Sequence, residues 1–178
     1  MTRWAMVIDL ERCIGCQACT VACQIRNDLP LGMFWNIVTT VGSTGKFPNL
    51  NYHHLPRSCF HCGNPPCVHC CPTAASSQRE DGIVIVNPDK CIGCGACIIA
   101  CPYGARTKNK TLGIVQKCTF CADNGREPYC VDTCHQRART FGDISDPKSE
   151  VYRLVNTENA TQIMPELGTD PHVYYIQP

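Results

Sequence analysis

Four cysteine-rich runs divide this chain, and they constrain its fold more than any other feature of the sequence. Two runs have the spacing C-x2-C-x2-C-x3-C, and their cysteines are Cys13, Cys16, Cys19, Cys23 and Cys91, Cys94, Cys97, Cys101. The other two runs are longer before the third cysteine, and theirs are Cys59, Cys62, Cys67, Cys71 and Cys118, Cys121, Cys130, Cys134. All four end in the same C-x3-C step, which indicates an internal repeat of one unit.

Three kinds of protein use this much cysteine: disulfide scaffolds, structural zinc proteins and iron–sulfur proteins. The N-terminal residues contain no apolar segment followed by a small-residue cleavage site, which argues against a secreted disulfide framework. Zinc uses two separated pairs of ligands, whereas the first and third runs place a third and a fourth thiolate directly after the first pair. The spacing is instead that of bacterial ferredoxins, whose cysteines bind [4Fe–4S] clusters.

The last cysteine of each run is expected to serve a different cluster from the other three. In two-cluster ferredoxins the fourth cysteine of a run ligates the cluster of the other run, so the runs work in pairs. Four runs therefore predict four [4Fe–4S] clusters, with Cys70 left over as a buried thiol outside them. Because every run already has four cysteines, His61 and His69 are expected beside a cluster or at the surface, and His135 either modulates a cluster or lies at the surface.

The net charge of the chain changes sign once the bound clusters and their thiolates are counted. The formal net charge is +1, but each oxidised cluster with its four thiolates carries about −2, so four clusters shift the total to roughly −7. An acidic holoprotein without a basic run argues against nucleic-acid binding. The sequence has no twin-arginine pair and no apolar run long enough to span a bilayer. These features predict a cytoplasmic protein that associates with a membrane only through a partner. Export together with a partner that carries the signal is also compatible with the sequence.

Short strand and helix signals flank the runs and predict an α+β fold. Residues 4–10 and 83–86 read as strands that each lead into a cysteine loop, and residues 18–25 and 96–100 read as short helices that follow. This order is that of the β-loop-α unit of small ferredoxins. The glycines before Cys16 and Cys94 either supply turn geometry or let backbone N–H groups approach the cluster, and the sequence leaves both interpretations open.

Two segments lie outside the cysteine repeat. Residues 24–58 form an insertion in which one or two strands are expected. Residues 143–178 contain no cysteine and only a weak strand signal at 173–176, so this segment is expected to be a C-terminal arm that packs on the core or on a partner.

With these features together, the chain resembles a known family over essentially its whole length. The order of the four runs, the core of the second run (Cys62-Gly-Asn-Pro-Pro-Cys67) and the segment Ala138-Arg-Thr-Phe-Gly-Asp143 are similar to the four-cluster electron-transfer subunit of the molybdopterin oxidoreductases. Members serve dimethyl sulfoxide, polysulfide, thiosulfate and arsenate reductases. One departure is the end of the fourth run, where His135 follows Cys134 and the family usually shows Cys-Pro-x-Gly-Ala, which puts the local conformation in question.

The resemblance implies two interleaved bacterial-type 2[4Fe–4S] ferredoxin-like modules, one from residues 1–23 plus 102–142 and one from residues 59–101. It implies four ligand sets: Cys13, Cys16, Cys19 and Cys134 for cluster 1; Cys118, Cys121, Cys130 and Cys23 for cluster 2; Cys59, Cys62, Cys67 and Cys101 for cluster 3; Cys91, Cys94, Cys97 and Cys71 for cluster 4. No ligand position is lost, so four cubanes are expected.

The resemblance also implies partners. The expected catalytic subunit holds a bis-pterin molybdenum or tungsten cofactor, and many members add a quinone-reactive membrane anchor or use a soluble redox partner. The chain itself would relay electrons and catalyse no reaction. The alternative is a free polyferredoxin shuttle, which needs neither the insertion at 24–58 nor the cysteine-free tail. A cluster-bearing regulatory or structural protein is a third, less favoured class.

Overall fold

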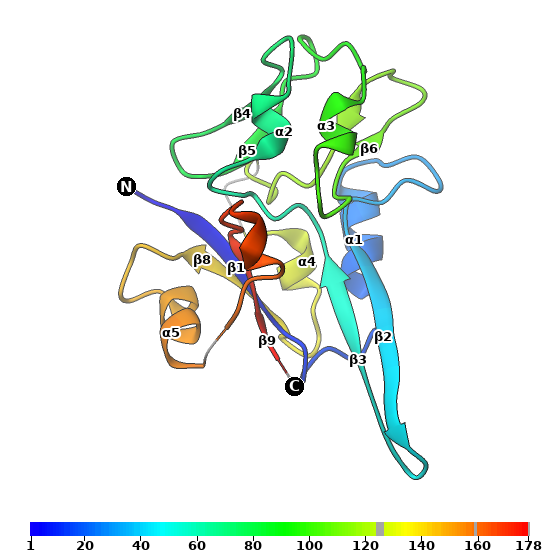
Figure 1. The fold of residues 1–178 in the computed structure, drawn as a ribbon, viewed down its shortest axis with the longest axis vertical. Helices are drawn as coiled ribbons and strands as arrows, with labels where there is room; N and C mark the ends of the chain where they lie inside the picture. The colour runs from blue at the N-terminus through cyan, green and yellow to red at the C-terminus, as the bar shows by residue number, and fades with distance from the viewer. Residues whose placement is uncertain (124–126, 159, 178) are drawn as a thin grey trace.

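A computed structural model of the chain describes residues 1–123, 127–158 and 160–177. Short helices and small sheets alternate along it (Figure 1), the mixed α and β character predicted from the sequence. In chain order the elements are β1 (Trp4–Asp9), α1 (Ala18–Arg26), β2 (Ile37–Lys46), β3 (Asn49–Arg57), α2 (Pro66–His69), β4 (Ser76–Gln78), β5 (Val84–Val86), α3 (Ala96–Ile99), β6 (Thr107–Lys108), β7 (Val115–Gln116), α4 (Tyr129–Asp132), β8 (Arg139–Asp143), α5 (Glu150–Thr157), the 3-10 helix η1 (Pro165–Leu167) and β9 (Val173–Ile176).

The largest sheet joins the two ends of the chain. Its strand order is β8-β1-β9, with β1 antiparallel to β8 and parallel to β9. Successive side chains of a strand point to opposite faces. On one face of β1, Met6 and Ile8 enter the main hydrophobic core, and on the other Val7 packs with Val151 and Leu154 of α5. The tail therefore packs on the body of the protein. This is one of the two arrangements expected from the sequence, packing on the core or on a partner.

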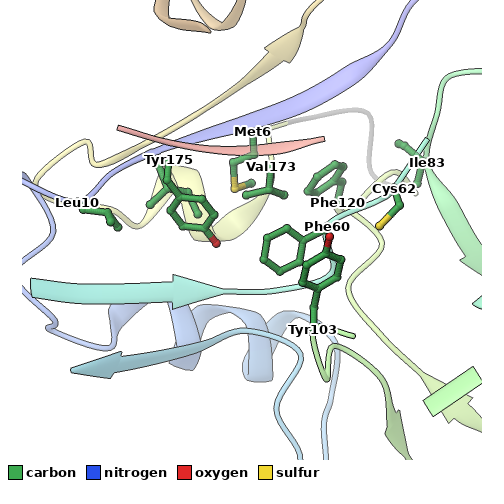
Figure 2. Packing of buried hydrophobic residues seen from close by; sticks show 10 residues of the cluster. Met6, Leu10, Phe60, Cys62, Ile83, Tyr103, Phe120, Val173 and Tyr175 are labelled. Atoms are coloured by element: carbon green, nitrogen blue, oxygen red, sulfur yellow. The ribbon is translucent and has the colours of Figure 1, made fainter. Parts of the chain in front are cut away.

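The main core lies between this sheet and the second and fourth cysteine runs (Figure 2). The ring of Phe60 stacks on that of Tyr103 with centroids 4.2 Å apart. Tyr175 of β9 is fully buried, and its hydroxyl donates a hydrogen bond of 2.8 Å to the backbone carbonyl of Pro56. This core thus connects the first strand, the last strand and two of the cysteine runs.

The cysteine runs associate in two pairs. Helix α1 of the first run packs against α4 of the fourth, and α2 of the second run packs against α3 of the third. The second pair is flanked by the hairpins β4-β5 and β6-β7, in which Val84 and Val115 are buried against Cys67 and Cys97. Figure 1 shows this pair of helices together at one end of the molecule.

The insertion is a long β-hairpin. Strands β2 and β3 pair antiparallel from Ile37↔Arg57 to Lys46↔Asn49, and the hairpin projects away from the body of the protein (Figure 1). Its distal part exposes Phe47 and Tyr52, with 89% and 65% of their surface accessible. The sequence expectation of one or two strands is confirmed at its upper limit. Within the described residues, no helix combines the length and apolar character needed to cross a bilayer.

His172 connects the tail to the N-terminus and makes stability depend on pH. Its side chain is only 2% exposed, and Nε2 accepts a hydrogen bond of 2.9 Å from Nε of Arg3. Burial, and then the charge of Arg3, lower its pKa to about 4. Above about pH 6.5 the histidine is neutral in both the folded and the unfolded chain, so it does not affect the free energy of unfolding.

Below about pH 6.5 His172 becomes protonated in the unfolded chain but stays neutral in the folded protein, so the free energy of unfolding falls as the pH falls. We expect a loss of about 3 kcal/mol between pH 6.5 and pH 4 from this group. Urea unfolding of the holoprotein at several pH values in this range, compared with His172→Gln, measures it. The variant should lose less stability on acidification, and equal slopes would contradict the assignment.

Candidate iron–sulfur sites

Eight of the cysteines line two cavities, and each cavity combines two different runs. The first, site A, is lined by Cys13, Cys16 and Cys19 of the first run and by Cys134 of the fourth. The second, site D, is lined by Cys91, Cys94 and Cys97 of the third run and by Cys71 of the second. In both, three cysteines of one run meet the last cysteine of another.

The other eight cysteines form two more groups inside the protein. In site B, Cys23 is close enough to Cys121 and Cys130 for their charges to raise its pKa, and the charges of Cys23 and Cys130 raise the pKa of Cys118. In site C, the charges of Cys59, Cys67 and Cys101 raise the pKa of Cys62. These sets have the same composition as sites A and D: three cysteines of one run and the last of its partner.

Burial is the largest cause of these shifts, and the neighbouring thiolates add to it. The pKa values of Cys23 and Cys62 both rise to about 12. Gathering thiolates around Cys23 and Cys62 is therefore unfavourable unless a positive charge lies among them. A [4Fe–4S] core supplies that positive charge, and a thiol that coordinates its iron is held in the deprotonated form. The donor set of each site thus fits a cluster.

The geometry of the sites differs from that of a single-ion site. Across the described residues, no three His, Cys, Asp or Glu side chains converge as they would around one metal ion. The cysteines of sites A and D surround a cavity instead. A cavity lined by four cysteines suits a cubane, in which each thiolate binds a different iron.

Backbone amides point at several of the sulfurs. The N–H groups of Ser76, Val115, Phe120 and Ala138 donate to Sγ of Cys71, Cys91, Cys118 and Cys134 over 3.3–3.4 Å. Such bonds favour the thiolate form. At Cys71, burial raises the pKa, but the amides of Ser76 and Thr73 outweigh it and hold the pKa below its ordinary value.

All four runs have a residue with left-handed backbone geometry directly before their second cysteine. The residue there has a positive φ in every run: 69° at Gly15, 45° at His61, 65° at Gly93 and 53° at Phe120. A Cβ at Gly15 would lie 2.6 Å from the ring of His54, so glycine is also needed there for space. The backbone N–H of Gly15 bonds to Cys13 as well. At Gly15, turn geometry and amide approach therefore both apply.

The unusual end of the fourth run keeps the conformation of its counterparts. Three residues after the last cysteine, φ is 51° at Ala74 in the second run, 62° at Gly104 in the third and 49° at Arg137 in the fourth. Arg137 therefore adopts the left-handed geometry that glycine favours. The departure from the family pattern at His135 leaves the turn intact.

The leftover residues fall in several environments. His69 and His135 are exposed, in agreement with the surface alternative. His61 is completely buried and stacks on Phe120 with ring centroids 3.8 Å apart, and burial followed by the charge of Lys117 lowers its pKa well below the ordinary value. The prediction that Cys70 is buried is wrong: it lies at the C-terminal end of α2, where it is partly exposed.

Sequence reasoning missed two arginines that contact the cysteines. Arg106 donates to Sγ of Cys67 over 2.8 Å and to Oγ of Ser76 over 2.7 Å. Arg139 donates to Sγ of Cys19 and of Cys130, each over 3.7 Å. Burial lowers the pKa of each arginine, but the nearby thiolates outweigh it and raise the pKa above its ordinary value.

A sequence signal for these arginines existed. Arg106 and Arg139 each stand five residues after the last cysteine of their run, at Cys101 and Cys134. Aligning the third run with the fourth would have placed them at equivalent positions of the repeat.

The chain is similar to known iron–sulfur proteins. Residues 50–144 match the model of the 4Fe-4S dicluster domain, and residues 4–24 match that of a 4Fe-4S binding domain. The chain is 47% identical to a subunit of the tetrathionate reductase of Salmonella typhimurium, over 98% of its own length and 72% of the relative. It is 41% identical to a component of the polysulfide reductase of Wolinella succinogenes, over 98% of its own length and 94% of the relative.

A third relative is the iron-sulfur subunit of the arsenate respiratory reductase of Shewanella sp. (strain ANA-3), which is 35% identical over 98% of the chain and 96% of the relative. Coverage this complete includes all four cysteine runs of the chain. The chain therefore belongs to the family of 4Fe–4S electron-transfer subunits of the molybdopterin oxidoreductases.

Proposed function

We propose that the chain holds four [4Fe–4S] clusters, one in each of sites A to D. Site A would bind cluster 1, site B cluster 2, site C cluster 3 and site D cluster 4. Support comes from the two cavities that combine cysteines of different runs and from the mutual pKa effects among the other eight cysteines. The packing of α1 on α4 and of α2 on α3 supports two interleaved ferredoxin-like modules, residues 1–23 plus 102–142 and residues 59–101.

The proposed role is to relay electrons through these clusters between a molybdenum or tungsten pterin catalytic subunit and a membrane or soluble redox partner. The observation that carries it is the exposure at sites A and D. Cys16 and Cys94 are exposed, and the neighbouring Ile14 and Ile92 have 58% and 66% of their surface accessible. In sites B and C no cysteine is exposed. Two sites at the surface and two in the interior suit a chain of clusters in which electrons enter at one exposed cluster and leave at the other.

A test of the cofactor content is iron and sulfide analysis of anaerobically purified protein. About sixteen irons per chain are expected, and fewer than about twelve would contradict the four-cluster proposal. The functional test is co-purification from the native source. A stable complex with a pterin-containing subunit is expected, whereas a chain isolated alone that serves several unrelated reductases would favour the free shuttle. The cytoplasmic location stays a prediction from the sequence.

A further inference from the structure

Three basic side chains are buried among the cysteine sites. Arg106 and Arg139 are each 4% exposed, and Lys117 is 2% exposed. Among the described residues, none of the three forms an ion pair with a carboxylate. A buried charge is costly unless an opposite charge accompanies it. The compensating charge at these positions must therefore come from the thiolates and what they bind.

Arg139 lies between sites A and B. Its guanidinium donates to Cys19 of site A and to Cys130 of site B, and bonds to Asn36 over 2.6 Å and to Sδ of Met6 over 3.4 Å hold it in place. Its charge acts on the pKa of Cys13 in site A and of Cys23 in site B. One cation thus contacts two sites at once.

Arg106 occupies the corresponding position between sites C and D. It donates to Cys67 of site C and lines the cavity of site D. Its Nε and Nη1 atoms are buried and have no hydrogen-bond partner among the described residues. Two buried, unsatisfied donors of a cation that contacts the Cys67 thiolate suit the sulfides of a neighbouring cluster.

Lys117 lies at the remaining junction, between sites B and C. It immediately precedes Cys118 of site B, and its Nζ donates to the carbonyls of Cys118 and Val84. Its charge also acts on His61, which lies between Phe60 and Cys62 in the run that supplies most of site C. The two sites adjoin here, because the charge of Cys59 acts on Cys118.

The contacts therefore place the four sites in the order A, B, C, D. Arg139 lies between sites A and B, Lys117 between B and C, and Arg106 between C and D. We propose that each of these three cations raises the reduction potentials of the two clusters it separates. One-electron reduction takes each cluster with its thiolates from about −2 to about −3 and adds no proton, so a fixed positive charge nearby stabilises the reduced form. It also screens the repulsion between electrons on neighbouring clusters. This proposal rests on the four-cluster assignment.

The test is a redox titration of the holoprotein, followed by EPR, for Arg139→Gln, Lys117→Gln and Arg106→Gln. Each variant should lower the equilibrium constant for one-electron reduction of two clusters by at least about tenfold, which corresponds to about 59 mV. Arg139→Gln and Arg106→Gln should shift two different pairs with no member in common. Lys117→Gln should shift one cluster from each of those pairs.

The controls separate charge from structure. Arg106→Lys and Arg139→Lys keep the charge, so both variants should retain most of the wild-type reduction potential at the clusters that the Gln variants shift. Arg153→Gln removes an exposed arginine of α5 and should leave all four potentials unchanged. The proposal is overturned if all four potentials move together or if none moves. A neutral variant that loses iron also counts against it, since the cation would then serve assembly. A wild-type protein with fewer than about twelve irons would instead defeat the four-cluster assignment itself.

Discussion

Replacing Cys134 by serine is expected to change the cluster of the first run, although Cys134 is the last cysteine of the fourth. The reason is that Cys134 lines a cavity with Cys13, Cys16 and Cys19. Serine is a much weaker ligand for iron than a thiolate, so the cluster should lose one iron or be lost entirely. EPR of the reduced protein should show one cluster signal altered, and iron analysis should fall by about one to four atoms per chain.

The matched variant is Cys23→Ser, at the end of the first run. Cys23 is close to Cys121 and Cys130, so this change should affect the cluster of the fourth run and leave that of the first. Cys70→Ser is the negative control, because Cys70 lies outside the four ligand sets, and it should keep all four signals. If Cys134→Ser removed only the cluster bound by Cys118, Cys121 and Cys130, the crossed arrangement would be wrong.

Much of this fold could be predicted from the cysteine spacing, because the metal chemistry fixes the local geometry. The expected strands at residues 4–10, 83–86 and 173–176 correspond to β1, β5 and β9, and the helices expected at 18–25 and 96–100 correspond to α1 and α3, with each boundary within one residue. These segments are short and carry strong local signals. Their positions relative to the runs follow from the repeat.

Other features depend on contacts between distant parts of the chain. The left-handed conformation of His61 and Phe120 has no local sequence signal, since glycine occupies that position in only two of the four runs. Stacking of these two rings buries both residues, and this tertiary contact offsets a backbone cost of about 1–2 kcal/mol per residue. The repeat offers a signal for the two buried arginines, which share one position after a last cysteine, but it does not show their contacts. Cys130 is 9 residues from Arg139, whereas Ser76, Cys67 and Cys19 are 30 to 120 residues from the arginine that each contacts.

The tail illustrates how tertiary contacts can override local signals. Its sequence predicts an arm with one weak strand and gives no indication of α5. Val151 and Leu154 of α5 are buried against Ala5 and Val7 of β1, so the helix is stabilised by the sheet it covers rather than by its own eight residues. The sequence pattern of so short a helix gives little signal.

Tyr175→Ala tests whether the tail is an integral part of the core. Tyr175 is fully buried in β9, contacts the ring of Phe60 at 6.2 Å between centroids, and bonds to Pro56 of the hairpin strand β3. Truncation leaves a cavity and an unsatisfied carbonyl, so we expect the free energy of unfolding to fall by about 3–5 kcal/mol. With a urea m value of about 2 kcal/mol/M, the unfolding midpoint should fall by about 2 M.

Two other variants divide this effect into its parts. Tyr175→Phe keeps the ring and removes only the hydroxyl, so it should cost about 1–2 kcal/mol. Tyr52→Ala makes the same truncation on the exposed part of the hairpin and should change stability by less than about 0.5 kcal/mol. If Tyr175→Ala costs no more than Tyr52→Ala in anaerobic urea unfolding followed by cluster absorbance, the tail does not support the core. A large difference means that the last strand stabilises the core that it shares with β1 and the cysteine runs, because the loss of a single side chain of the tail then destabilises the cluster-bearing fold.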